Sequence, residues 1–114
     1  MNPKIAGILI MVGVAVIGAV GQVFFKKAAP GFSISLELIK NVPFIIACTL
    51  YAVTLVLAMI AYRKAEVSIL YPVMSLSYIF LIILASMFLG EKITPWKVGG
   101  SLLIIGGVAM IGFA

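Results

Sequence analysis

The stretch that decides the fold is residues 5–27, IAGILIMVGVAVIGAVGQVFFKK. It is apolar from Ile5 to about Phe25 and ends in two lysines, Lys26 and Lys27. About 20 apolar residues in a helix cross roughly 30 Å of hydrocarbon, which is the thickness of a bilayer core. The stretch therefore predicts a membrane-spanning helix that ends in two cations at the headgroup level.

Three further apolar runs follow, and short polar segments separate them. The longest of these segments, residues 28–42, contains proline, glycine, serine and charged residues and is predicted to be a loop. An even number of spans places both termini on the same side of the membrane. We predict an all-α integral membrane protein with one domain over residues 1–114 and four transmembrane helices, at about 5–25, 44–62, 67–89 and 96–113.

The composition agrees with a membrane protein. Hydrophobic residues make up 65% of the 114 residues and charged residues 10%, whereas a soluble domain has about 25% charged residues. The net charge of +5 comes from lysines and arginines scattered in ones and twos between the apolar runs. They are typical of anchors at helix ends and do not form a nucleic-acid-binding patch.

The residue types also limit the chemistry. The chain has no histidine, three acidic residues and one cysteine, Cys48. Catalytic triads, paired carboxylates and clusters of metal ligands cannot be built from this set within one chain. We therefore expect no enzymatic activity, no metal site and no cofactor. A transporter needs a cavity and two conformations, not bond-breaking side chains.

Polar side chains follow one face of the third run. Ser68, Tyr71, Ser75 and Tyr78 are spaced by 3, 4 and 3 residues, so they share a helix face. Two roles fit such a face, which can line a substrate path or bond neighbouring helices. Pro72 lies within the face and removes one backbone hydrogen bond, so it is a candidate hinge or only a kink.

The first run carries a second polar face. Gly18, Gln22 and Lys26 lie on it and Gly21 lies beside it, so a groove of small residues leads to an amide and then to a cation. Two interpretations of Lys26 are open. It extends to the headgroups like most lysines near helix ends, or it joins Gln22 in binding a phosphate or another anion.

The last run contains two glycine pairs seven residues apart, which therefore face the same direction. Such a face lets another helix approach closely, within the chain or in a second subunit. Because four helices form a thin bundle, we favour contact between subunits. The predicted dimer interface consists of Gly99, Gly100, Gly106 and Gly107.

Three stretches, in their order along the chain, resemble the drug/metabolite transporter superfamily. They are Gly21-Gln22 with Lys26, residues 70–78 (LYPVMSLSY), and residues 88–94 (FLGEKIT) before the glycine-paired last helix. Among its small four-helix members (EamA-like or small multidrug-resistance-like), the chain is most similar to subunits that flip undecaprenyl-phosphate-aminoarabinose. The resemblance covers nearly the whole chain. It implies a prokaryotic cytoplasmic (inner) membrane and a dimer with a central, alternately exposed cavity, formed by two copies or with a similar subunit.

The small multidrug-resistance exporters are the nearest rival. They resemble the chain in size and glycine stripe, but their first helix holds a membrane-embedded glutamate where this chain has Gly18. The acidic residues Glu37, Glu66 and Glu91 all lie near predicted helix ends, so no carboxylate is expected within the membrane. This departure weighs against proton-coupled export.

The sequence therefore predicts a transporter of a lipid-linked or small polar substrate, most specifically a polyprenyl-phosphate-linked sugar. One alternative is a proton-coupled exporter of small cationic compounds. Another is a non-transporting accessory subunit that assembles with a larger partner. Expected partners are membrane lipid, the substrate and a second four-helix subunit. The predicted cavity residues are Gln22, Lys26, Tyr71, Ser75 and Tyr78, with Pro72 as the hinge.

Overall fold

The computed structural model describes residues 2–113, and within that range every regular element is a helix. The elements are α1 (Pro3–Ala28), η1 (Ala29–Gly31), η2 (Leu36–Lys40), α2 (Val42–Tyr62), α3 (Val67–Val73), η3 (Met74–Leu76), α4 (Ser77–Leu89) and α5 (Pro95–Gly112). Together, α3, η3 and α4 make one span, so four segments are long and apolar enough to cross a membrane. The predicted all-α membrane fold with four spans is confirmed.

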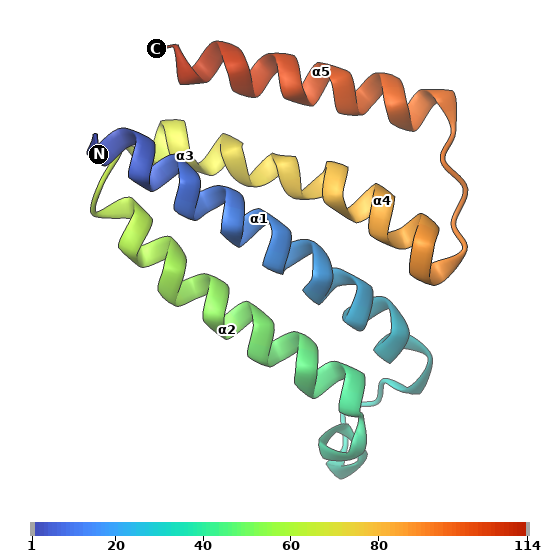
Figure 1. Ribbon diagram of the computed structural model, residues 1–114. Helices are drawn as coiled ribbons and strands as arrows, with labels where there is room; N and C mark the ends of the chain where they lie inside the picture. The colour runs from blue at the N-terminus through green and yellow to red at the C-terminus, as the bar shows by residue number, and fades with distance from the viewer. Residues whose placement is uncertain (1, 114) are drawn as a thin grey trace.

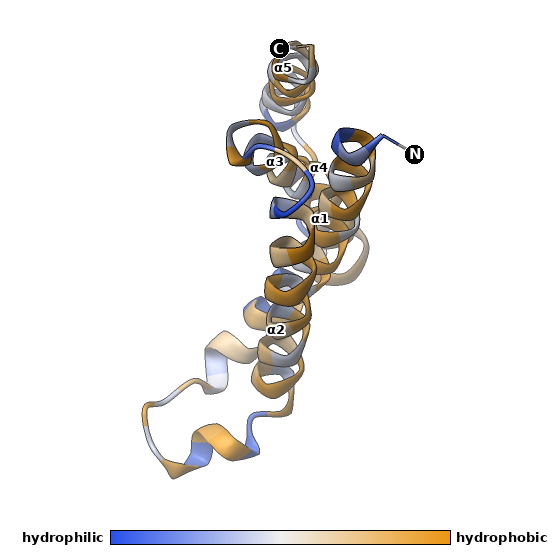
Figure 2. Cartoon of the chain, turned by 90° about the vertical axis from the view of Figure 1, so that its left-hand side faces the viewer, coloured by the Kyte–Doolittle hydropathy of each residue, from blue (hydrophilic) through white to orange (hydrophobic). Residues whose placement is uncertain are grey.

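The helices lie side by side in the order α2, α1, α3–α4 and α5, with both chain ends at the same edge of the layer (Figure 1). Seen edge-on, they stack in a narrow column with apolar residues along their length and polar residues mostly near the ends (Figure 2). The extents of 46 × 35 × 20 Å describe the same shallow layer. Both of its broad faces are therefore open.

The core of the layer lies where α1, α2 and α3 meet. Small residues bring the backbones together there: an added Cβ on Gly7 would lie 3.3 Å from the Ala65 Cβ and 3.3 Å from a Leu70 methyl carbon. Tight packing of this kind is what holds helices together in lipid, where apolar burial alone gives no preference. The buried cluster consists of Met11, Val14, Ala58, Ala61, Leu70 and Val73.

The helix starts follow from capping side chains. Asn2, Asn41 and Thr94 precede α1, α2 and α5, and each accepts a hydrogen bond from a backbone amide of the first turn. A proline follows each cap within the first two helical positions, where its missing amide hydrogen costs nothing. The capping explains why α1 begins at Pro3, before the apolar run itself.

The third span is not one continuous α-helix. Because Pro72 has no amide hydrogen, the carbonyl of Ser68 loses its usual helical partner. The chain then tightens into the 3-10 turn η3 before α4 continues. The Ser75 hydroxyl donates a hydrogen bond to the Pro72 carbonyl and satisfies part of the disturbed backbone. The irregularity lies at the proposed hinge, and whether the segment bends during function stays a prediction.

The α4 helix ends at Gly90, whose φ of +69° and ψ of 17° are left-handed. The Glu91 amide donates to the Ala85 carbonyl at 3.2 Å and closes the end of the helix. We expect Gly90→Ala to lower the free energy of unfolding by about 1–2 kcal/mol, because a Cβ is strained in this region. Chemical unfolding in detergent measures the effect. Gly90→Asn, which tolerates the conformation better, should lose less; equal stability of both variants and the wild type would contradict the prediction.

The α5 helix is the most exposed of the four spans. None of its residues is buried. Its carboxyl-terminal half packs on α3 and η3, where Val108 touches the core cluster, and the Lys4 ammonium donates to the Gly112 carbonyl at 3.1 Å. The last contact joins the two ends of the chain on one side of the layer. Most of α5 is thus available to lipid or to another subunit.

Candidate functional site

The polar face of α1 meets α2 at Tyr51. The Gln22 side-chain amide donates a hydrogen bond to the Tyr51 hydroxyl, and that hydroxyl lies 3.4 Å from the Gly18 carbonyl oxygen. A Cβ added to Gly21 would lie 2.8 Å from Tyr51 Cε2. The tyrosine ring of α2 therefore occupies the space beside Gly21, whereas the space beside Gly18 stays open. Sequence reasoning missed Tyr51, although these glycines indicated a close approach by another helix.

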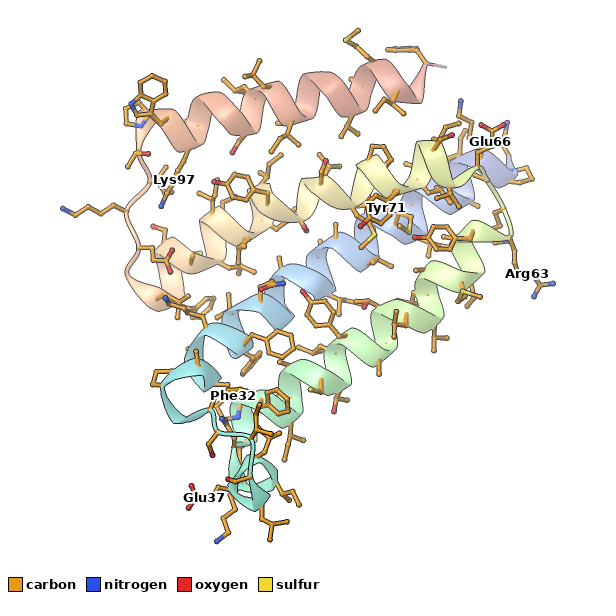
Figure 3. The ribbon with its side chains drawn as sticks, turned by 180° about the vertical axis from the view of Figure 1, so that it is seen from behind. Phe32, Glu37, Arg63, Glu66, Tyr71 and Lys97 are labelled. Atoms are coloured by element: carbon orange, nitrogen blue, oxygen red, sulfur yellow. The ribbon has the colours of Figure 1, made fainter. Side chains whose placement is uncertain are left out.

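Aromatic neighbours hold Tyr51 in place. Its ring lies 5.2 Å from the Phe25 ring, and Phe25 packs edge-on against Phe44 at 6.0 Å between centroids. Phe32, from the segment between α1 and α2, continues the row at 5.8 Å from Phe44 (Figure 3). Offset and edge-on contacts of this kind are the favourable geometries for aromatic pairs. Because its partner is fixed, the Gln22 amide has a defined orientation.

A hollow of about 180 Å³ opens between α1 and α4, and we call it the α1–α4 hollow. Gln22 and Lys26 line it from α1, and Glu91 lines it from the segment after α4. Residues that bear an amide, a cation and an anion therefore line one hollow together with apolar residues. The sequence placed Glu91 at a helix end without linking it to this site. The remaining lining residues are Leu81, Ala85 and Leu89.

A second hollow, of about 100 Å³, adjoins the first toward α5. The two share Leu81, Ala85 and Glu91, and the second adds Tyr78, Ile82, Lys92 and Lys97. Lys97 points from α5 toward α4 (Figure 3), and its ammonium donates to the Lys92 carbonyl at 2.8 Å. Three lysines and one glutamate line the pair of hollows, so this end of the layer favours an anionic ligand.

The five predicted cavity residues are only partly brought together. Gln22 and Lys26 share one hollow, and Tyr78 lies in the adjoining one. Tyr71 and Ser75 lie one to two turns before Tyr78 and are exposed, Tyr71 by 63%. The Ser75 hydroxyl donates to the Pro72 carbonyl, so its proton is already engaged. Of the third span, only the part nearest Gly90 lines a hollow together with α1.

Open space lies beside the glycine pairs of α5 among residues 2–113. A Cβ built on Gly99, Gly100, Gly106 or Gly107 meets no other atom within 4 Å. The face is therefore free to receive a helix from another subunit. The dimer interface itself stays a prediction.

No family model and no solved structure match the chain. Two curated proteins are similar to part of it. Over 47 residues it is 43% identical to phosphoenolpyruvate/phosphate translocator 1, chloroplastic, of Arabidopsis thaliana and 40% identical to the triose phosphate/phosphate translocator, non-green plastid, chloroplastic, of Brassica oleracea var. botrytis. These similarities and the four apolar helices support a membrane transporter. Each matched region covers 41% of this chain and 12% of the relative's length.

The three acidic residues all lie outside the apolar part of the spans. Glu37 is in η2, Glu66 immediately precedes α3, and Glu91 follows Gly90. Gly18, where the small exporters carry their glutamate, is at mid-helix with open space beside it. Among residues 2–113, no three histidine, cysteine or acidic side chains group as metal ligands. The polar groups that the spans offer a substrate are therefore the Gln22 amide and hydroxyls, with charges at the helix ends.

Proposed function

We propose that the protein is one subunit of a transporter that moves a phosphate-bearing lipid, most specifically a polyprenyl phosphate linked to an amino sugar. The observation that carries this proposal is the α1–α4 hollow, in which Gln22, Lys26 and Glu91 face an apolar wall. A phosphate fits Lys26 and Gln22, and the sugar ammonium fits Glu91. The proposal requires no bond-breaking chemistry.

The Gln22 amide retains hydrogen-bonding capacity beyond its contact with Tyr51. A carboxamide has two N–H donors and a carbonyl acceptor, and the contact with Tyr51 uses one donor. The second donor and the Lys26 ammonium are available to phosphate oxygens. A charged acceptor makes such hydrogen bonds about twice as strong as neutral ones. Gln22 and Lys26 are thus the phosphate-binding pair of this proposal.

The shape of the layer supports movement of a headgroup while its tail stays in lipid. Apolar residues of α4 line the hollow beside Gln22 and Lys26, so in this proposal a polyprenyl chain next to it remains in hydrocarbon. Tyr78, Ser75 and Tyr71 supply hydroxyls toward the other side of the membrane for a sugar leaving Lys26. In this proposal the irregular backbone after Pro72 is the hinge that lets this path open alternately to each side.

A second four-helix subunit is needed to close the open face. We propose that it is a second copy or a similar chain, which packs on the glycine stripe of α5 in a prokaryotic cytoplasmic membrane. The exposure of α5 and the space beside its glycines support this arrangement. The curated relatives are named as chloroplastic. The proposed prokaryotic membrane rests instead on the resemblance to the four-helix flippase subunits.

The stripe gives a direct test of assembly. We expect Gly106→Leu with Gly107→Leu to shift the protein from dimer to monomer in detergent, because leucine side chains prevent close approach of two backbones. Light scattering after size-exclusion chromatography measures the shift. Ala109→Leu enlarges an exposed position of α5 roughly 120° from the stripe and should leave the dimer intact. A dimer unchanged by the glycine substitutions would place the interface elsewhere.

The similar proteins favour a second candidate. They are named as translocators of phosphoenolpyruvate/phosphate and of triose phosphate/phosphate, so they support phosphate as the recognised group but suggest a water-soluble substrate. The same Gln22–Lys26 pair would bind such a compound. The two candidates differ in whether an apolar tail is required.

Reconstituted liposomes separate these functions. We expect the protein to move a radiolabelled polyprenyl-phosphate amino sugar between leaflets, measured with a membrane-impermeant reagent that modifies its amine. Glu91→Gln should reduce the preference for the amino sugar over its hydroxyl counterpart, because the carboxylate is removed. Uptake of triose phosphate without lipid movement would favour the second candidate. Drug-dependent proton release would favour export of cations, and inactivity until a partner is added would favour an accessory subunit.

A further inference from the structure

The other side of the contact between α1 and α4 carries a larger, almost entirely apolar groove. Its volume is about 410 Å³, within the range of small-molecule and lipid pockets. Lys27 is its one charged lining residue, and the Lys27 ammonium lies 6.0 Å from the centre of the Phe88 ring. This distance is at the limit for cation–π attraction, which holds the charge near the groove. The apolar lining consists of Val20, Val23, Phe24, Leu84 and Phe88.

This groove is separate from the proposed substrate site. Successive helical residues differ by about 100°, so Lys27 points away from Lys26. Lys26 lines the α1–α4 hollow with Leu81 and Ala85, whereas Lys27 lines the groove with Leu84 and Phe88. The two adjacent lysines therefore line different spaces, one on each side of the contact between α1 and α4. An occupant of the groove would not compete directly for Lys26.

A hollow of about 550 Å³, which we call the polar hollow, adjoins the groove at the carboxyl-terminal end of α1. Lys27 lines both spaces, and the hollow adds Lys40, Glu37 and Asn41. The Asn41 side-chain amide donates to the Ala28 carbonyl at 3.1 Å and fastens the start of α2 to the end of α1. The apolar groove and the polar hollow thus adjoin at Lys27, and the Asn41 hydrogen bond fixes one wall of the hollow.

We infer that an anionic glycerophospholipid of the surrounding bilayer binds here, with one acyl chain in the groove and its headgroup in the polar hollow. The phosphate lies between Lys27 and Lys40, and headgroup hydroxyls donate to Glu37. Two lysines and one glutamate give the hollow a charge of about +1, which complements a lipid of net charge −1, such as one with a phosphoglycerol headgroup. A zwitterionic lipid has no net charge to match.

Native mass spectrometry of the full-length protein tests the inference. The protein, released from liposomes containing equal amounts of phosphatidylglycerol, phosphatidylethanolamine and phosphatidylcholine, should retain phosphatidylglycerol in excess. Lys27→Gln and Lys40→Gln should each lower that retention about fivefold, since one lysine near an anionic surface contributes about that factor. Lys64→Gln, an exposed lysine after α2, is the matched control and should have no effect.

Filling the groove provides a second, independent variant. Val20→Trp should displace the acyl chain and lower lipid retention while both lysines remain. Because Lys27 and Lys40 are exposed, their double substitution keeps the test valid if the tryptophan variant fails to fold. Equal retention of all three lipids, or unchanged retention of phosphatidylglycerol by the Lys27→Gln, Lys40→Gln variant, would overturn the inference. Transport through the Gln22–Lys26 pair is measured separately, so failure of one proposal leaves the other standing.

Discussion

Replacing Gln22 and Lys26 together by alanine is expected to lower transport of a polyprenyl-phosphate amino sugar at least tenfold, and up to about 100-fold. A hydrogen bond to a charged group contributes about 1.5–3 kcal/mol, and 1.4 kcal/mol corresponds to a factor of ten. Initial rates of lipid movement in liposomes, corrected for the amount of folded protein, measure the effect.

Two controls separate recognition from packing. Tyr51→Phe removes the hydroxyl that binds Gln22 but leaves the amide and the aromatic contacts, so it should change transport much less than the double variant. Lys64→Ala removes a lysine at the other end of the spans and should have little effect. If the folded double variant Gln22→Ala, Lys26→Ala transported the lipid at the wild-type rate, the site assignment would be wrong.

Replacing Gly21 by leucine is expected to cause the largest loss of stability. A Cβ at this position would lie 2.8 Å from the Tyr51 ring, and that ring is held by both Gln22 and Phe25. Overpacking of this kind typically costs about 1–3 kcal/mol. Thermal unfolding in detergent should show a lower Tm, and transport should fall as α1 and α2 separate.

Gly13→Leu is the matched control, because Gly13 lies on the same helix and a Cβ there meets no atom within 4 Å. Tyr51→Ala should partly rescue Gly21→Leu by making room for the new side chain, which a double-mutant cycle detects as non-additivity. Equal stability of the two leucine variants would show that α2 does not pack on Gly21 as described.

The hydrophobic pattern was sufficient to predict the spans, whereas it did not predict every contact of the polar residues. Gln22, Lys26 and Tyr78 were chosen as candidates because polar groups within or beside an apolar run are costly in lipid and need partners. Glu91 was not assigned to the site because it lies at a helix end, where a glutamate next to a lysine is ordinary. Its entry into the hollow depends on the Gly90 turn and on the position of α1.

The sequence by itself was sufficient to predict four apolar helices that can span a membrane, and an even number of spans places both termini on one side. Apolar runs of about 20 residues between charges have few other stable arrangements in a bilayer. Only the tertiary structure decided that Tyr51 fills the space beside Gly21 and that Lys26 and Lys27 line different spaces between α1 and α4. The physical reason is that most of each helix surface is apolar, so the order and rotation of the helices come from the fit of small and large side chains, which hydrophobicity does not encode.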